Sequence, residues 1–284
     1  MSISLKTLRQ TLGLSVGECI VSTLTGTPTA TVLYDETLAD SGESAQLYQG
    51  AYLLMTSGAQ SGQVRRVSEY AQANGALTMG RAFSSAPAAG DTYEMHKLMA
   101  PADLNRCINE GLGRCWYLTR EELTIVEGQR EYALSGYTWL TQPAQVVNVL
   151  WKSGDTASAY RYNPLDWYHV SEDAGELTLH IRPYTAESTD ALVLQAIRPY
   201  EELASDSATT DCPQAWALAA ARMMVYRWLM YNAPAQDVGR YKEQYALASA
   251  EFAGLNRRYA PRPPRRAQHS DSPQRGVDSD IVTW

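Results

Sequence analysis

Hydrophobic positions recur at helical spacing in the last part of this chain, where they predict two helices. The first, at 213–231, is apolar around almost its whole circumference, which is typical of a buried helix. The second helix carries one apolar seam at alternating spacings of three and four, with charged residues on the rest of its surface. That seam consists of Val238, Tyr241, Tyr245, Ala248, Phe252, Leu255 and Tyr259. Pro234 cannot continue the first helix and suits the first turn of the second, so we expect a helical hairpin.

Packing within one chain would explain this seam, but the seam could instead meet a neighbouring subunit. Tyr241, Tyr245 and Phe252 are therefore candidate subunit contacts. Trp167 and Tyr168, in a predicted loop, are two more, because aromatic side chains with a polar tip suit subunit contacts. The chain has 18 Tyr and 7 Trp but only 2 Phe, a bias that is also common in ordinary β-proteins.

Alternating and β-branched stretches predict an N-terminal β-module within residues 15–98, after a short amphipathic helix that carries Leu5, Leu8 and Leu12 on one side. Asn74-Gly75 lies between two such stretches and is a strong hairpin signal, because both residues tolerate positive φ. The module is expected to be a small antiparallel barrel or sandwich.

A further helix is predicted from Pro101, followed by strand-like sequence up to residue 198. Its apolar face contains Leu104, Cys107, Ile108, Leu112, Cys115 and Leu118. Gly111 and Gly113 weaken this helix by up to about 1 kcal/mol each relative to alanine, so we expect it to rely on packing.

Together these elements predict an α+β protein. It contains an N-terminal antiparallel β-module (1–98), a core (99–258) and an extended basic C-terminal arm (259–284). The core is a bundle made of one helix and the C-terminal helical hairpin (211–258), with a β-rich insertion at 119–200.

The net charge of −7 argues against a surface built to hold nucleic acid. The four cysteines form no C-x-x-C pair, and we interpret them as buried thiols in a reducing compartment. Neither a signal peptide nor an apolar run long enough to cross a membrane is visible in the sequence.

Motifs for chemistry are missing from the sequence. It has no phosphate-binding G-x-x-x-x-G-K-[ST] loop, no H-E-x-x-H and no G-x-S-x-G, and its four histidines are scattered. Paired carboxylates such as Glu121-Glu122 occur in polar connections, where solvated surface is the ordinary interpretation. We therefore expect no catalytic residues, no cofactor and no metal ion, and a protein that is not an enzyme.

The C-terminal arm carries a basic strip made of Arg257, Arg258, Arg262, Arg265 and Arg266. Prolines between these arginines favour a stiff, extended chain, and arginine forms bidentate pairs with carboxylate or phosphate. Trp284 ends the chain as an apolar anchor after a polar spacer. A solvated tail without function explains such an end, but the pattern is also typical of a peptide that docks into a partner.

Residues 103–152 resemble head-to-tail connector (adaptor, or neck) proteins of tailed bacteriophages. The resemblance lies in Asp103-Leu104-Asn105-Arg106-Cys107-Ile108-Asn109-Glu110-Gly111-Leu112, in Leu123-Thr124-Ile125-Val126-Glu127-Gly128-Gln129-Arg130-Glu131-Tyr132-Ala133-Leu134, and in Trp139-Leu140 with Gln145-Val146-Val147-Asn148-Val149. Residues 47–96 also resemble modules of phage virion proteins, through Tyr52–Thr56, Ser57-Gly58, Gly62-Gln63-Val64-Arg65-Arg66 and Pro87-Ala88-Ala89-Gly90-Asp91-Thr92-Tyr93-Glu94.

The family implies a structural virion protein in the phage neck, assembled in the host cytoplasm as a ring that is usually dodecameric. The implied partners are the portal protein, other copies of the chain, a tail or nozzle protein, and double-stranded DNA that passes without sequence specificity during ejection. Portal docking would fall to the arm, with Arg257, Arg258, Arg262, Arg265, Arg266 and Trp284. The β-module is an addition to the minimal family pattern, and its role stays open between decoration, tail attachment and ring bracing.

An alternative from another class is a tail-associated β-module that binds a carbohydrate or receptor. It would use Trp139, Trp151, Trp167 and Tyr168 as stacking platforms. The basic arm and the long helical hairpin fit this alternative poorly.

Overall fold

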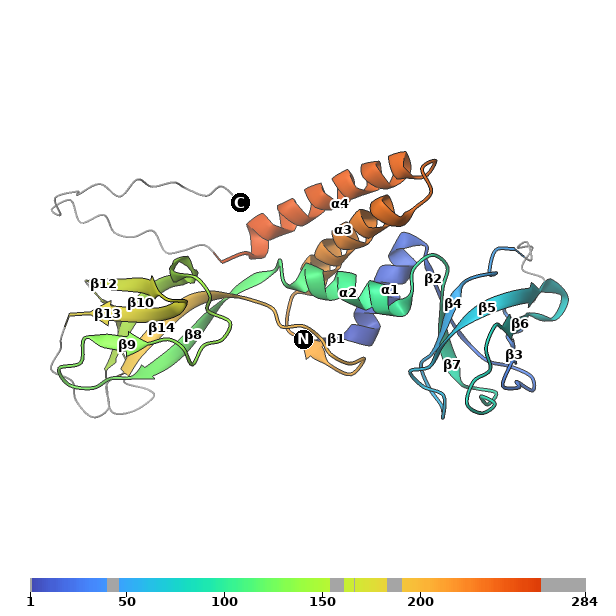
Figure 1. The fold of residues 1–284 in the computed structure, drawn as a ribbon, viewed down its shortest axis with the longest axis horizontal. Coiled ribbons are helices and arrows are strands. Elements are labelled where there is room, and N and C mark those ends of the chain that lie inside the picture. The colour runs from blue at the N-terminus through green and yellow to red at the C-terminus, as the bar shows by residue number, and fades with distance from the viewer. Residues whose placement is uncertain (1, 40–45, 154–160, 166, 183–190, 262–284) are drawn as a thin grey trace. The chain divides into compact units, whose positions relative to one another are not determined.

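The computed structural model describes residues 2–39, 46–153, 161–165, 167–182 and 191–261. These residues form four α-helices and several antiparallel sheets, which confirms the predicted α+β class with an N-terminal β-module and C-terminal helices (Figure 1). The chain divides into two compact units. Met1–Leu118 and Arg198–Ala260 form the first, and the second contains Thr119–Ile197.

Four helices of the first unit share one hydrophobic core. They are α1 (Leu5–Val16), α2 (Pro101–Leu112), α3 (Gln214–Asn232) and α4 (Val238–Tyr259). Ser4 caps α1 by accepting a hydrogen bond from the backbone N–H of Thr7, at 3.2 Å. The break between α3 and α4 falls at the predicted place, and the two helices pack along each other as the expected hairpin.

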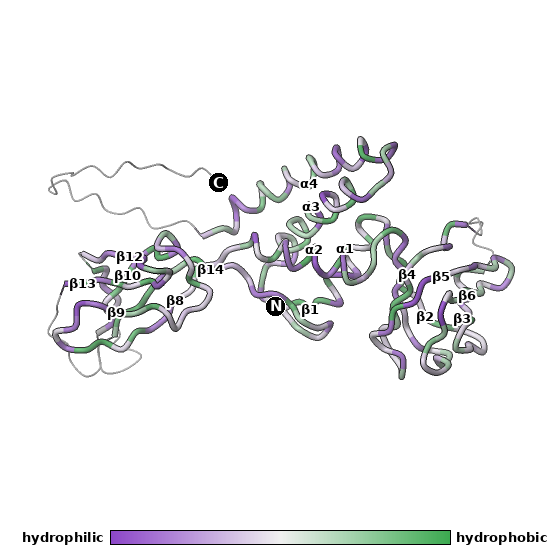
Figure 2. The backbone as a smooth tube through the Cα atoms, in the orientation of Figure 1, coloured by the Kyte–Doolittle hydropathy of each residue, from purple (hydrophilic) through white to green (hydrophobic). Residues whose placement is uncertain are grey.

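The buried faces of the hairpin follow the sequence pattern closely. Trp216, Ala220 and Met223 of α3 are buried, as are Tyr241 and Ala248 of α4. The other seam residues of α4, from Tyr245 to Tyr259, are partly buried and pack against the same core. Figure 2 shows hydrophobic and hydrophilic positions alternating along α4. Tyr231, assigned from sequence to the buried helix, is instead 75% exposed at the end of α3.

The α2 helix is shorter than predicted. It ends at Leu112, where the chain turns, so Cys115 lies in the connection that follows and Leu118 lies in a strand, 41% exposed. Cys107 and Cys115 are therefore not on one helix. Helix propensity is weakest at this end, because Gly111 and Gly113 are both glycine, and the last turn closes with a hydrogen bond from the Gly113 backbone N–H to the carbonyl oxygen of Asn109.

The predicted β-module is a six-stranded antiparallel sheet in the order β2-β7-β4-β5-β6-β3. Its strands are β2 (Cys19–Thr23), β3 (Val32–Tyr34), β4 (Tyr52–Met55), β5 (Val64–Ala71), β6 (Ala76–Met79) and β7 (Thr92–His96). A short 3₁₀ turn, Gln72–Asn74, precedes Gly75 between β5 and β6, so the connection is longer than the expected two-residue turn. Gly75 has φ +62°, and a Cβ there would lie 2.0 Å from the carbonyl oxygen of Asp35, which leaves room only for glycine.

A hydrophobic cluster fills this module, with one buried polar pair inside it. Leu33, Leu53, Met55, Leu77 and Met95 are among its fully buried side chains. The Tyr93 hydroxyl donates to Asp35 Oδ2 at 2.5 Å. Thr37 donates to Asp35 Oδ1 through its backbone N–H and its hydroxyl. Both oxygens of this buried carboxylate are thus satisfied.

The second unit contains two antiparallel sheets around their own core. One has the order β11-β10-β14-β8 and the other β12-β13-β9. Their strands are β8 (Trp116–Thr124), β9 (Glu131–Ala133), β10 (Val146–Ser153), β11 (Arg161–Pro164), β12 (Tyr168–Asp173), β13 (Glu176–Ile181) and β14 (Ala191–Pro199). Leu177, Leu179 and Ile181 are buried, as the alternation in β13 predicts.

Candidate functional site

A buried arginine on α1 is the centre of the most highly connected polar site in the described part of the chain. Arg9 is a charged residue, yet it is only 1% exposed, because it lies on the apolar side of the helix, four residues after Leu5 and three before Leu12. Its Nε and Nη2 donate to the two oxygens of Glu94 on β7, at 2.7 and 3.0 Å. Its Nη1 and Nη2 donate to Asp206 at 2.5 and 2.8 Å, and Nη1 also lies 3.2 Å from Asn105 Oδ1 on α2.

Glu94 receives two further hydrogen bonds on its side of the site. Gln10 Nε2 donates to Glu94 Oε1 at 3.1 Å, and His96 Nε2 lies 3.0 Å from Glu94 Oε2. Burial by itself would raise the pKa of Glu94. The hydrogen bonds from His96 and Arg9 and the positive charge of Arg9 outweigh burial and lower this pKa to about 2. The carboxylate is therefore ionised at neutral pH.

The same contacts that lower the pKa of Glu94 raise the pKa of Arg9. Burial lowers the pKa of Arg9, but its hydrogen bonds to Asp206 and Glu94 outweigh burial and raise that pKa above its ordinary value. The guanidinium thus joins α1, the β7 strand of the β-module, and the 203–208 segment that precedes β15 (Thr209–Thr210). This network is a structural joint, because it satisfies its charges within the protein and exposes none of them except at Asp206.

Three side chains at this site are of types that bind metal ions. Cys19, Glu94 and His96 are all buried, with ligand atoms within 4.8 Å of one another, and His96 Nδ1 has no hydrogen-bond partner in the described part of the chain. Thiolate, imidazole and carboxylate are common zinc ligands. However, both Glu94 oxygens already accept two hydrogen bonds each within the protein. These contacts favour a structural ion-pair network over a metal site.

Sequence reasoning missed this site because its members come from distant segments. Most of the β-module lies between Arg9 and Glu94 in the sequence, and Asp206 comes only after residues 119–197 of the second unit. One local signal was available: an arginine at the spacing of the Leu5, Leu8 and Leu12 stripe must find a buried partner. A second was the alternation in β7, which turns Glu94 and His96 to the side opposite Tyr93 and Met95.

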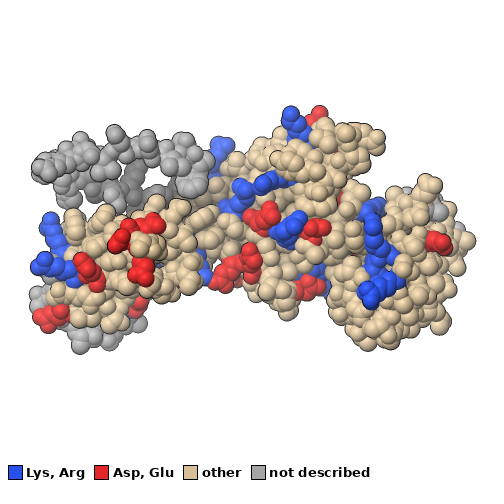
Figure 3. All heavy atoms as spheres, in the orientation of Figure 1, with Lys and Arg blue, Asp and Glu red and all other residues tan. Residues whose placement is uncertain are grey.

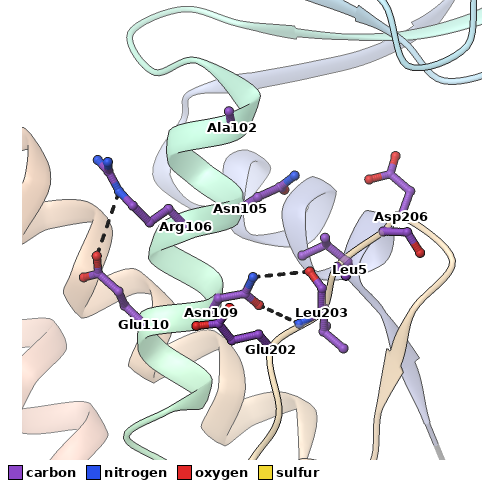
Figure 4. A pocket seen from close by; sticks show the side chains of 11 residues that line it. Leu5, Ala102, Asn105, Arg106, Asn109, Glu110, Glu202, Leu203 and Asp206 are labelled. Carbon is purple, nitrogen blue, oxygen red and sulfur yellow. Dashed lines mark hydrogen bonds and ion pairs between the residues drawn. The ribbon is translucent and has the colours of Figure 1, made fainter.

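A shallow polar cavity of about 450 Å³ lies beside the network, between α2 and the 202–206 segment (Figure 4). Asn109 exchanges two hydrogen bonds with the backbone of Leu203, at 3.0 and 3.2 Å, and so fixes this segment to α2. Arg106 lies between Asp103 and Glu110 on the exposed side of α2. The cavity is lined by the carboxylates of Glu110, Glu202 and Asp206 and by Ser205, and by no histidine, cysteine or lysine. Glu110 is paired with Arg106 and Asp206 with Arg9, so two of these carboxylates are held in ion pairs.

The predicted subunit contacts on α4 lie on the inner side of the hairpin. Tyr241 is 8% exposed, and Tyr245 and Phe252 are partly buried against the helical core. The opposite side of α4 carries a second surface, made mostly of small and apolar side chains between the charged residues Glu243 and Arg257. We call it the outer α4 face, and its exposed residues are Ala246, Leu247, Ala250, Ala253 and Gly254. Leu247 is 66% exposed there.

Of the other residues predicted to contact a partner, four lie within the described part of the chain and four lie outside it. Trp167 is 44% exposed, whereas Tyr168 is partly buried and donates from its hydroxyl to the carbonyl oxygen of Val147 at 3.1 Å. Arg257 and Arg258 lie in the last turn of α4 and are exposed. Arg262, Arg265, Arg266 and Trp284 lie outside the described residues, so their portal-docking role stays a prediction.

Positive charge gathers on one face of the β-module, where Figure 3 shows a stripe of Lys and Arg. Within the described residues, Arg65 and Arg66 donate only to neutral acceptors, namely Gln63 and backbone carbonyl groups. Their guanidinium groups lie 5.0 Å from the ring centres of Phe83 and Tyr52, respectively. Arg65 and Arg66 are consecutive in β5 and so point to opposite faces of the sheet, and the hydrogen bonds of both within the described residues go to neutral acceptors.

Comparisons with known proteins give little. No family model matches the chain, and no curated protein matches it. Among solved structures, one similar chain belongs to the virion of a native gene transfer agent particle, with 21% sequence identity and a TM-score of 0.25. The similarity covers 28% of this chain and 28% of that chain, and a likeness of this extent carries no argument about fold or function. In the described part of the chain, no helix is both long and apolar enough to span a membrane.

Proposed function

We propose that this chain is a structural virion protein of a tailed phage. In this proposal it forms a ring, dodecameric as in the family it resembles, between the portal and the tail. The order of its elements carries the proposal: one helix, a β-rich insertion, a helical hairpin and then a basic arm. The α2 and α3 helices pack directly against each other although the whole second unit separates them in sequence, as expected for a helical bundle that carries an insertion.

The arm would dock to the portal through Arg257, Arg258, Arg262, Arg265, Arg266 and Trp284. The first two of these lie in the last turn of α4, so the hairpin would hold the start of the basic strip. Arginines in extended chain suit an acidic groove on the portal protein. DNA would pass the ring without sequence-specific contacts, and a tail or nozzle protein would bind the other side.

Ring closure requires two different faces of each copy to meet. The outer α4 face is a suitable contributor, because its residues from Ala246 to Gly254 are small or apolar and most of the Leu247 surface is exposed. Tyr245 and Phe252 lie on the inner side of α4 and are only partly buried within one chain, so they could supply a separate subunit contact. The second unit supplies Trp167 as a further exposed aromatic residue.

The proposal includes no catalytic role. The buried ion network, and the shallow cavity in which two carboxylates are paired with Arg9 and Arg106, both fit a structural role.

Mass photometry of the chain alone, and mixed with the portal ring from the same source, tests the proposal. A ring-sized particle in either sample supports the connector and gives its copy number. A monomer in both samples contradicts it and favours the tail-associated carbohydrate- or receptor-binding module. Deleting residues 260–284 should abolish portal binding and leave the circular dichroism spectrum unchanged, whereas retained binding would remove the arm from the proposal.

A further inference from the structure

Two histidines and a glutamate lie in one row across the three-stranded sheet of the second unit. His169 on β12 is paired with His180 on β13, and His180 is in turn paired with Glu131 on β9. Leu179 and Ile181 of β13 are buried in the core, so His180 between them points to the opposite face of the sheet. The row therefore lies on the outer face, where His169 and Glu131 are exposed and His180 is half-buried.

The contact between His180 and Glu131 has the spacing of two ligands of one metal ion. His180 Nδ1 lies 3.5 Å from Glu131 Oε1. This distance exceeds the length of an ordinary N–H···O hydrogen bond, which is about 2.7–3.2 Å. Zinc binds imidazole nitrogen and carboxylate oxygen at about 2.0–2.2 Å in tetrahedral geometry, which places two ligand atoms roughly 3.4 Å apart. A zinc ion therefore fits between these two atoms with little movement of either side chain.

Ser171 holds the His180 ring in the orientation that such an ion requires. The Ser171 Oγ atom lies 2.7 Å from His180 Nε2, the ring nitrogen that does not face Glu131. When Nε2–H donates to this hydroxyl, the neutral imidazole has its lone pair on Nδ1, toward Glu131. Histidines that bind metal ions usually donate their other ring N–H to a fixed acceptor, which sets the tautomer. Ser171 thus has the place of a positioning residue.

His169 can supply a third ligand from the neighbouring strand. Its ring is stacked on that of His180, with ring centres 6.0 Å apart and planes at 29°. Residues directly opposite each other on antiparallel strands have Cβ atoms about 4.5–5.5 Å apart. Rotation of the exposed His169 side chain to another rotamer therefore brings a ring nitrogen to the ion without movement of the backbone. Two imidazoles and one carboxylate leave the fourth position of a tetrahedral ion to water.

The surroundings of this row differ from those of the buried Glu94. Both Glu94 oxygens accept hydrogen bonds inside the protein, whereas the Glu131 side chain is 71% exposed and that of His180 is 29% exposed. An ion can therefore reach both ligands from solvent. A serine hydrolase would also use a serine, a histidine and a carboxylate, but it needs a hydrogen bond between the last two. The 3.5 Å contact between His180 and Glu131 is longer than such a bond and favours the metal site.

We propose that His169, His180 and Glu131 form a zinc site on the outer face of the second unit. Two nitrogen ligands and one oxygen ligand suit zinc, whereas magnesium and calcium prefer oxygen ligands alone. The ion would tie β9, which is only three residues long, to β13 and β12. The expectation of no metal ion rested on the scatter of the histidines along the chain, and it is the pairing of β12 with β13 that brings two of them together.

Zinc titration of the purified full chain tests the site. The chain is first treated with EDTA and then competes for zinc with a chromophoric chelator. We expect saturable binding of one zinc ion per chain that excess magnesium does not displace. The midpoint of thermal unfolding should rise with zinc and fall again with EDTA, because the ion binds the folded chain. Zinc binding is measured on the isolated chain, so its result is independent of whether a ring forms.

Variants on the outer face assign the ligands, and circular dichroism checks that each one folds. His169→Ala, His180→Ala and Glu131→Gln should each weaken zinc binding by more than about tenfold. Ser171→Ala should weaken it by about tenfold, as expected for a residue that orients a ligand. His269→Ala is the matched control, because it removes a histidine from outside the row and should leave zinc affinity unchanged. A wild-type chain that binds no zinc, zinc affinity that survives the joint loss of His169 and His180, or displacement by magnesium would overturn the proposal.

Discussion

Gly111 on α2 lies so close to Ala221 on α3 that a Cβ atom on residue 111 would be 2.7 Å from the Ala221 backbone nitrogen. It would also lie 2.9 Å from the carbonyl carbon of Ala220. These are backbone atoms of a buried helix, so they cannot move aside as a flexible side chain would. Contact between helices at such short range needs a residue without a side chain.

Gly111→Ala should therefore destabilise the protein although alanine is the better helix former. We expect a loss of about 1–3 kcal/mol in the free energy of unfolding, because overpacking at the contact exceeds the gain in helix propensity. Denaturant unfolding followed by circular dichroism measures this loss. Gly113→Ala is the matched control: residue 113 is exposed, has φ −61° and has no atom nearer than 3.6 Å to a new Cβ, so this change should be neutral or slightly stabilising. Equal effects of the two changes would contradict the close contact.

Periodicity predicted the parts of the fold that are fixed by local rules. The α3–α4 hairpin, the seam with Tyr241 and Ala248, and the inward side of β13 all follow from apolar spacing within one element. The end of α2 did not follow, because the apolar spacing continues through Cys115 after the helix has stopped at Leu112. Gly113 marked that end, but a glycine can equally be tolerated within a helix.

The candidate site was largely out of reach from the sequence. Its ion pairs join residues that are far apart in the chain, and periodicity says nothing about which distant carboxylate meets Arg9. Non-local pairing of polar groups depends on the packed topology rather than on local pattern.

Arg9→Met should be among the most destabilising single changes in the first unit. It leaves Glu94 without its main cationic partner in a site that is fully buried, and breaking a buried pair in this way costs about 3–5 kcal/mol. Arg106→Met removes an arginine from exposed pairs with Asp103 and Glu110 and should cost less than about 1 kcal/mol. Urea unfolding of both variants gives the comparison, and a similar small loss for both would mean that the Arg9 network contributes little.

Joint replacement of Arg9 and Glu94 tests whether the two side chains act as one unit. Because each single change leaves the other charge buried, Arg9→Met with Glu94→Met should cost less than the sum of the two single changes. Additive losses would show that the two residues stabilise the protein independently.

Lowering the pH should lower the free energy of unfolding, because Glu94 becomes protonated. The pKa of this carboxyl is lowered from 4.5 to about 2 in the folded chain, so its contribution is complete above pH 4.5 and is lost as the pH falls toward 2. The expected loss is about 3 kcal/mol over that interval. Glu18 acts in the opposite sense, because burial raises its pKa despite the Leu98 backbone N–H and the charges of Lys97 and Arg240.

Comparison with Glu94→Gln isolates this contribution, since Glu18 is unchanged in the variant. Unfolding free energies measured between pH 6 and pH 2 should fall more steeply for the wild-type chain than for Glu94→Gln. Parallel curves would assign acid sensitivity to other groups.

Substitutions on the two sides of α4 should have different effects: on the inner side they should lower monomer stability, and on the outer side they should prevent assembly. Phe252 is partly buried against the helical core, so Phe252→Ala should lower the free energy of unfolding of the monomer by about 1–3 kcal/mol, less than for a fully buried ring. Leu247 is 66% exposed on the outer α4 face, and Leu247→Glu should change monomer stability by less than about 0.5 kcal/mol. If this face joins subunits, the added charge should remove the ring-sized particle from mass photometry while the monomer stays folded. A ring that persists with Leu247→Glu would place the subunit contact elsewhere, and loss of stability in that monomer would show that the outer face is already covered within the chain.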